Sequence, residues 1–142
     1  MSKTCTFCEI ASGRLPAHLV YRDTYCLAFL DKRPLFHGHT LLVPHDHIST
    51  LDQMDIPWAG HFFQILCMLS AAVEKGMGAE GTFVAQNNKI SQSVAHLHFH
   101  IVPRKKNDGL KGFFWPRHPY GSEEQMKEAA KKIENALKEM RF

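Results

Sequence analysis

The segment His96–Val102 carries three histidines at alternate positions, with apolar residues between them. Because successive side chains of a β-strand point to opposite faces, a strand here would place His96, His98 and His100 on one face. Neighbouring imidazoles would then lie about 6.5–7 Å apart, from a rise of about 3.3 Å per residue. An imidazole has a pKa near 6.5, so near neutral pH it can act as a nucleophile, a base or a metal ligand.

Three interpretations of this segment are open. The imidazoles could form a nucleophilic site, they could bind one metal ion, or they could be solvent-facing side chains without a role. Alternate residues of one strand can reach a common metal, but such sites usually draw ligands from more than one segment. The core-type residues between the histidines favour a functional role over an exposed surface.

A second group with chemical potential is the pair Cys5 and Cys8, which has the spacing of half a zinc-binding knuckle. A complete site needs two further ligands, and Cys26 and Cys67 lie in unrelated, core-like settings. The alternative is a pair of free thiols. Since residues 1–10 contain no apolar signal core, we expect a cytoplasmic protein with thiols or metal ligands rather than disulfides.

The composition indicates one soluble globular domain of 142 residues, with 44% hydrophobic and 22% charged residues. A net charge of +3 is too small to indicate binding to nucleic acid or to an anionic membrane. The most apolar stretch, Trp58–Val73, contains His61 and Gln64 and falls short of the roughly 20 apolar residues of a membrane span. We therefore expect no nucleic-acid partner and no membrane partner.

The elements that must position these groups follow from residue patterns. Short apolar runs separated by turns predict five strands, at residues 19–21, 25–30, 40–43, 81–86 and 94–102. An apolar stripe after Asp55 predicts a long helix closed by Gly76, and Ser122 with Gln125 predicts the start of a second amphipathic helix. The fold class expected is α+β, with an antiparallel sheet.

The chain resembles the histidine triad (HIT) family, whose signature alternates histidine and apolar residues as in His96–Val102. The resemblance covers roughly residues 4–104. Further matching motifs lie in family order, at Cys5-x-x-Cys8-Glu9-Ile10, Leu15-Pro16-Ala17, Ala28-Phe29-Leu30-Asp31, Gly38-His39-Thr40-Leu41-Leu42-Val43-Pro44, His47-Ile48, Asn87 and Gln92-Ser93-Val94. The resemblance implies a single HIT domain over 1–142, with a C-terminal extension from about 105. It also implies a homodimer that forms a ten-stranded sheet.

The resemblance also implies an activity, hydrolysis at the α-phosphate of purine nucleoside phosphoramidates or dinucleoside polyphosphates. In this HINT-like branch His98 would attack phosphorus and form a covalent nucleotidyl-histidine, leaving an AMP-like product. His100 would stabilise the phosphate charge, and His39 would lie beside the same site. Histidine rather than glutamine at position 100 favours hydrolases over the uridylyltransferase-like relatives.

Binding residues are implied in the same way. The phosphate would contact Gln92, Ser93 and either Asn87 or Asn88, and Asp31 would hold the ribose hydroxyls. The base would contact apolar residues that could equally be plain core, namely Phe7, Ile10, Leu15 and Phe29. A structural zinc ion would be held by Cys5, Cys8, His47 and His96.

Two alternatives to an enzyme stay open, a nucleotide-binding regulatory module with little turnover and a structural zinc protein whose histidines only bind metal. Trp115 is a candidate to reach a partner's active site. The remaining histidines are interpreted as surface or loop residues, namely His18, His37, His45, His61 and His118.

Overall fold

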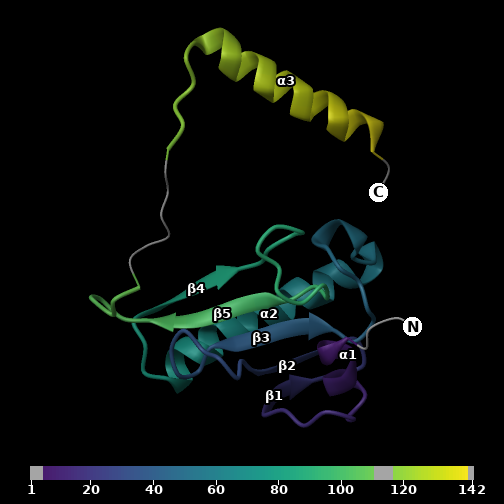
Figure 1. Cartoon of the computed structure of the whole chain (residues 1–142), viewed down its shortest axis with the longest axis vertical. Coiled ribbons are helices and arrows are strands. Elements are labelled where there is room, and N and C mark those ends of the chain that lie inside the picture. Colours follow the sequence, from purple (N-terminus) through teal and green to yellow (C-terminus); the bar gives the residue numbers. More distant parts are fainter. Residues whose placement is uncertain (1–4, 111–116, 141–142) are drawn as a thin grey trace. The chain divides into compact units, whose positions relative to one another are not determined.

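The computed structural model describes residues 5–110 and 117–140. The chain divides into two compact units, residues 1–108 and 109–142, and each is described by itself. The first unit is a five-stranded sheet in the order β1-β2-β3-β5-β4, in which every neighbouring pair is antiparallel (Figure 1). The strands are β1 (Leu19–Arg22), β2 (Cys26–Leu30), β3 (Thr40–Pro44), β4 (Gly81–Ala85) and β5 (Phe99–Arg104). The predicted α+β class with five antiparallel strands is confirmed.

The two faces of the sheet carry separate apolar clusters, because side chains alternate along each strand. Along β2, Cys26 and Ala28 join the cluster under the long helix α2 (Ile56–Gly76), while Leu27 and Phe29 face the other way. The opposite face is covered by the short helix α1 (Thr6–Ala11), whose buried side chains pack on β2 and β3. Each face of the sheet therefore buries its own apolar cluster, one under α2 and the other under α1.

Helix α2 presents the predicted apolar stripe to the sheet, and its buried residues are Phe62, Ile65, Leu66, Leu69 and Val73. Pro57 lies in its first turn, and Asp55 occupies the N-cap position without a side-chain capping bond. By length and mean hydropathy this helix could cross a membrane, although the sequence pattern predicts no span. Core helices pass the same test, and the buried stripe of α2 lies against the strands.

The strand that bears the histidines starts later than predicted. Strand β5 begins at Phe99, so His96 and His98 precede it and only His100 lies within it. The predicted alternation of faces is nevertheless confirmed, since Leu97, Phe99 and the following isoleucine belong to the cluster under α2. Two short elements were not predicted, namely α1 and the 3-10 helix η1 (Leu51–Gln53).

The second unit contains helix α3 (Glu123–Glu139). Its N-cap is Ser122, whose hydroxyl accepts a hydrogen bond from the backbone N–H of Gln125, as the sequence pattern predicts. The large apolar residues of its stripe are exposed, among them Met126, Ile133 and Leu137. Trp115 lies outside the described residues.

Candidate active site and metal-ligand cluster

The orientation of His98 is fixed by one hydrogen bond. Its Nδ1 lies 2.7 Å from the backbone oxygen of His96. A carbonyl oxygen only accepts hydrogen bonds, so Nδ1 carries the proton and Nε2 keeps its lone pair. The ring is 5% exposed and is packed edge-on against Phe7, with ring centroids 5.1 Å apart. A buried imidazole with a free Nε2 lone pair is suited to nucleophilic attack.

A second fixed imidazole pair lies beside it. The backbone N–H of Leu35 donates to Nδ1 of His39 over 3.1 Å, so the neutral ring carries its proton on Nε2. That Nε2 lies 2.9 Å from Nδ1 of His100 and 3.7 Å from the Asp31 carboxylate. His100 therefore accepts at Nδ1 and presents an N–H at Nε2, which can donate to an anion.

Burial keeps these rings uncharged. It lowers the pKa of His100 to about 4, with a further contribution from the neighbouring His98, and it lowers the pKa of His39. Burial disfavours the cation because the interior solvates charge poorly. Near neutral pH the His39 and His100 rings beside His98 are therefore uncharged.

The two triad histidines nearest β5 line a cavity of about 650 Å³, together with most of the residues predicted to contact substrate. Those in its wall are Phe7, Ile10, Leu15, Phe29, Asp31, Ser93, His98 and His100. His39 is adjacent through its bond to His100. Residues that were not predicted also line the cavity, including Thr6, His18, Lys32, Arg33 and Val94. Several of these residues directly precede or follow a predicted residue in the chain, and that adjacency could have identified them from the sequence.

The amide side chains of the predicted phosphate loop are not part of the cavity wall. The Gln92 amide donates to the backbone oxygen of Ser49 over 2.6 Å, and Asn87 donates to Ser91. The alternative, Asn88, accepts from the backbone N–H of Leu51. These amides hold the loop in shape, while Ser93 reaches the cavity.

A separate cluster brings together the predicted metal ligands, Cys5, Cys8, His47 and His96, with all four ligand atoms within 4.8 Å of one another. Nδ1 of His96 lies 3.3 Å and 3.5 Å from the two Sγ atoms, and Nδ1 of His47 lies 3.4 Å from Cys8. Nε2 of His96 donates to the backbone oxygen of Pro44, which leaves Nδ1 free to bind a metal. Two sulfur and two nitrogen donors fit tetrahedral Zn²⁺.

The three triad histidines do not converge on one metal. His96 faces the cysteines, His98 is bonded to a backbone carbonyl, and His100 is bonded to His39. Within the described residues, His98 belongs to none of the groups that could hold an ion. This arrangement disfavours the three-histidine metal site.

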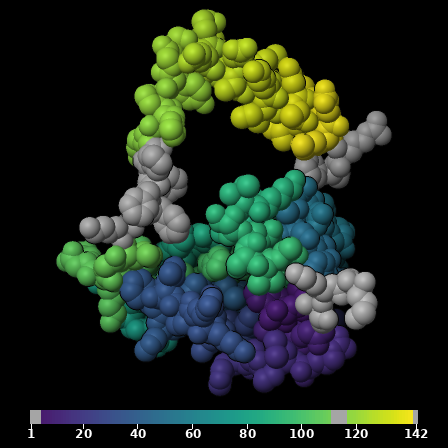
Figure 2. Space-filling model, in the orientation of Figure 1, coloured from purple at the N-terminus to yellow at the C-terminus, as the bar shows by residue number. Residues whose placement is uncertain are grey.

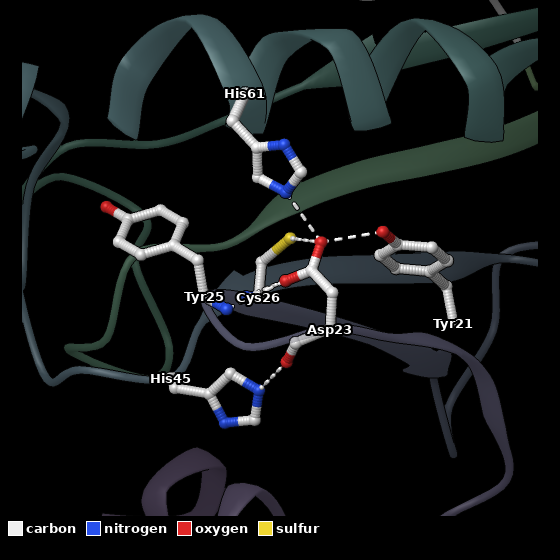
Figure 3. Close-up of polar contacts among 6 residues, drawn as sticks. All are labelled: Tyr21, Asp23, Tyr25, Cys26, His45 and His61. Atoms are coloured by element: carbon white, nitrogen blue, oxygen red, sulfur yellow. Dashed lines mark hydrogen bonds and ion pairs between the residues drawn. The ribbon is translucent and has the colours of Figure 1, made fainter. Parts of the chain in front are cut away.

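Two histidines interpreted as surface or loop residues contact Asp23, in the turn of the β1–β2 hairpin (Figure 3). His61 on α2 lies 2.6 Å from the Asp23 carboxylate, and His45 donates to the Asp23 backbone oxygen over 2.8 Å. His45 lies in a loop, as interpreted, and both side chains are partly exposed, but their contacts with Asp23 were not predicted because the partner is distant in sequence. Cys67, predicted to lie in a core-like setting, is exposed.

Comparison with known proteins came from a family model and from individual relatives. The model of the HIT domain matches residues 12–107. An adenosine 5′-monophosphoramidase of Schizosaccharomyces pombe is 31% identical over 137 residues, which cover 95% of this chain and 99% of that protein. A crystal structure of a HIT family member from Bacillus subtilis superposes with a TM-score of 0.87 at 30% identity, covering 99% of both chains.

A second solved structure bears on the metal-ligand cluster. It is a zinc-bound histidine triad family protein from Mycobacterium smegmatis, with a TM-score of 0.70 and 31% identity. The match covers 94% of this chain and 97% of that one.

Proposed function

Because the chain belongs to the HIT family, we propose that it hydrolyses purine nucleoside phosphoramidates or dinucleoside polyphosphates at the α-phosphate. The single observation that carries the proposal is the bond from His98 Nδ1 to the backbone oxygen of His96. It fixes the tautomer that leaves Nε2 as a nucleophile. The name of the yeast relative, a monophosphoramidase, supports a phosphoramidate substrate.

In the proposed reaction, Nε2 of His98 forms a bond to phosphorus while the bond to the leaving group breaks. The leaving group departs with that electron pair and takes up a proton. Water then attacks phosphorus and forms an oxygen–phosphorus bond, while the phosphorus–nitrogen bond breaks and its electron pair returns to Nε2 of His98. The attacking water loses a proton to solvent, and the nucleoside monophosphate is released. The N–H at Nε2 of His100 would donate to a phosphate oxygen as negative charge develops there.

The remaining cavity residues would hold the nucleoside. Oδ1 of Asp31 accepts only the backbone N–H of Arg33 among the bonds of the described residues, at 2.9 Å, so the carboxylate keeps capacity for ribose hydroxyls. Phe7, Ile10 and Phe29 would pack against the base, and Ser93 would contact the phosphate. Asn87 and Gln92 would act on the phosphate loop by holding its shape.

The proposed zinc ion has a structural role. Cys5, Cys8, His47 and His96 would hold it, and its chemistry would be limited to fixing these side chains. In the absence of a metal, burial and the neighbouring Cys5 thiol raise the pKa of Cys8 to about 11. A bound Zn²⁺ would stabilise the thiolate instead. Metal analysis of the purified protein, compared with Cys8→Ser, tests this part.

We also propose a homodimer formed through α2 and β4. Large apolar side chains are exposed on these two elements, namely Ile56, Trp58, Phe63, Met68 and Val84. Aromatic residues and Met are enriched at protein interfaces relative to the rest of the surface. A molar mass of one chain in light scattering, with no shift between the wild-type protein and Met68→Glu, would contradict the dimer.

The decisive experiment for the activity uses His98→Ala. We expect the variant to lose hydrolysis of adenosine 5′-phosphoramidate, and intact-mass measurement should detect a nucleotidylated chain only with His98 present. His118→Ala, which removes an exposed histidine of the second unit, is the matched control and should keep the activity. Tight AMP binding without turnover across a substrate panel would instead indicate a regulatory binding module.

A further inference from the structure

Helix α1 lies between the metal-ligand cluster and the cavity, and it contributes to both. Cys5 is its N-cap residue and Cys8 lies in its first turn, so the helix begins inside the cluster. Phe7 and Ile10, on the same six-residue helix, line the cavity. In the space-filling view the purple N-terminal atoms meet the green atoms that precede β5 (Figure 2).

The Phe7 ring connects the metal-ligand cluster to the cavity. Phe7 stands between the two cysteines in the chain, and it is 7% exposed. Its ring is packed edge-on against the ligand His96 and the nucleophile His98, with centroids 5.8 Å and 5.1 Å away, and against Phe29 at 5.4 Å. A displacement of Phe7 would therefore disturb the cavity wall and the packing of His98 together.

The helix is too short to hold this position by itself. Isolated helices shorter than about 12–15 residues are marginal in water, so the order of α1 depends on its tertiary contacts. Some of these contacts are apolar, through Phe7 and Ile10. Others are made by the cysteines, since both sulfurs face His96, and Cys5 Sγ also caps the helix locally by accepting the Cys8 N–H over 3.5 Å.

We propose that metal occupancy and nucleotide affinity are coupled through α1, with Cys5 and Cys8 acting as positioning residues for the Phe7 wall of the nucleotide cavity. The inference rests on the proposed function, which supplies both the zinc ion and the nucleotide. Metal bound to the cysteines would order α1 in advance, so a nucleotide would lose less free energy in ordering it. Linkage requires the converse, and bound nucleotide must strengthen metal binding by the same factor.

The experiment measures both directions of this coupling, without turnover. AMP is titrated calorimetrically into the zinc-loaded protein and into the chelator-treated protein, and we expect about tenfold weaker binding without metal. Zinc affinity is then measured by equilibrium competition with a chromogenic chelator, with and without saturating AMP. We expect AMP to raise the zinc affinity about tenfold, and an unchanged zinc affinity would overturn the proposal.

Three variants locate the coupling. Phe7→Leu should keep one zinc per chain and bind AMP more weakly, and the affinity ratio between loaded and metal-free protein should approach one. Cys8→Ser should match the metal-free protein, whereas Cys67→Ser removes an exposed thiol on α2 and should match the wild type. If the AMP affinities of zinc-loaded and metal-free Phe7→Leu still differ tenfold, the proposal that α1 couples the two sites is wrong.

The outcomes separate this inference from the proposed function. Equal AMP affinities with and without metal would overturn the coupling and leave the hydrolase proposal intact. If AMP binds in neither state, or if no zinc is retained, the proposed function loses its nucleotide or its metal, and the coupling is overturned with it.

Discussion

Two aspartates lie at opposite ends of strand β2, and each has a histidine neighbour, but their carboxylates are used differently. Asp23 precedes the strand and accepts hydrogen bonds from the Tyr21 hydroxyl, from His61 and from the N–H groups of Tyr25 and Cys26 (Figure 3). Asp31 follows the strand and accepts one backbone N–H. Since a carboxylate offers about four acceptor sites, Asp23 is saturated while Asp31 can still bind a ligand.

The difference shows how a structural aspartate–histidine pair can be told from a functional one. Although burial pushes the other way, the hydrogen bonds from Tyr21, Cys26 and His61 hold the pKa of Asp23 well below its usual range. Its pair ties α2 to the β1–β2 hairpin. Asp31 instead lines the cavity, where the unused acceptor sites of its carboxylate are available to a ligand.

The largest expected effect is a loss of catalytic activity when Asp31 is substituted. Asp31→Asn should lower kcat/KM for adenosine 5′-phosphoramidate about tenfold to a hundredfold, or about 1.4–2.7 kcal/mol, because a neutral amide binds ribose hydroxyls more weakly. Its melting temperature should stay close to that of the wild type. Steady-state kinetics and thermal unfolding check both statements, and an unaltered kcat/KM would remove Asp31 from the site.

Asp23→Asn should show the reverse pattern. Loss of the charge at a saturated acceptor should cost about 2 kcal/mol of unfolding free energy, a value reduced because His61 is partly exposed to solvent. The melting temperature should fall by roughly 6 °C or more. Calorimetry measures this loss, and kcat/KM at low temperature should be retained. A variant that is stable but inactive would break the comparison.

The pH dependence of stability should show two windows. His100 has a folded pKa of about 4, lowered by burial, so its contribution to stability is complete above its unfolded pKa near 6.5. It is lost as the pH falls from about 6.5 to 4, by roughly 1–2 kcal/mol. Asp23 has a lowered folded pKa, so its contribution is lost only as the pH falls below about 4. Urea unfolding of His100→Gln should show a smaller loss in the upper window, to which His39 and His96 also contribute through pKa values lowered by burial, and an unchanged loss in the lower one.

The smallest expected effect tests one bond of the saturated group. Tyr21→Phe removes a hydroxyl that lies 2.6 Å from the Asp23 carboxylate, and the bond raises the pKa of Tyr21 to about 12. We expect a smaller loss of unfolding free energy than for Asp23→Asn, because other donors continue to satisfy the carboxylate. A double-mutant cycle with His61→Asn should give non-additive losses, and strict additivity would mean that the donors do not act as a group.

The sequence predicted elements whose residues alternate or repeat regularly. The apolar stripe of α2 matched its buried residues, and the strand positions were close. Helix α1 was missed because six residues give no measurable period and three of them are polar or sulfur-bearing. The start of β5 was missed because His96 and His98 bond to backbone oxygens of Pro44 and His96, and such side-chain bonds leave no sequence pattern.

The candidate site was predictable where it follows a motif and not where it depends on distant partners. The cysteine spacing and the resemblance identified the four residues that the structure brings together as a metal-ligand cluster. The contact between His61 and Asp23 joins residues far apart in sequence, and nothing local to either one indicates it. Whether Asn87 or Gln92 could reach the cavity depended on the path of a loop, which composition does not determine.

The shortness and burial of β2 constrain how this sequence can evolve. Both faces of the strand are used, since Leu27 and Phe29 lie under α1 while Cys26 and Ala28 lie under α2. An insertion or deletion of one residue would exchange the two sets of side chains. It would also turn one of the flanking aspartates away from its neighbours. Descendants of this chain should therefore vary in length at the hairpin turns and conserve the number of residues between Asp23 and Asp31.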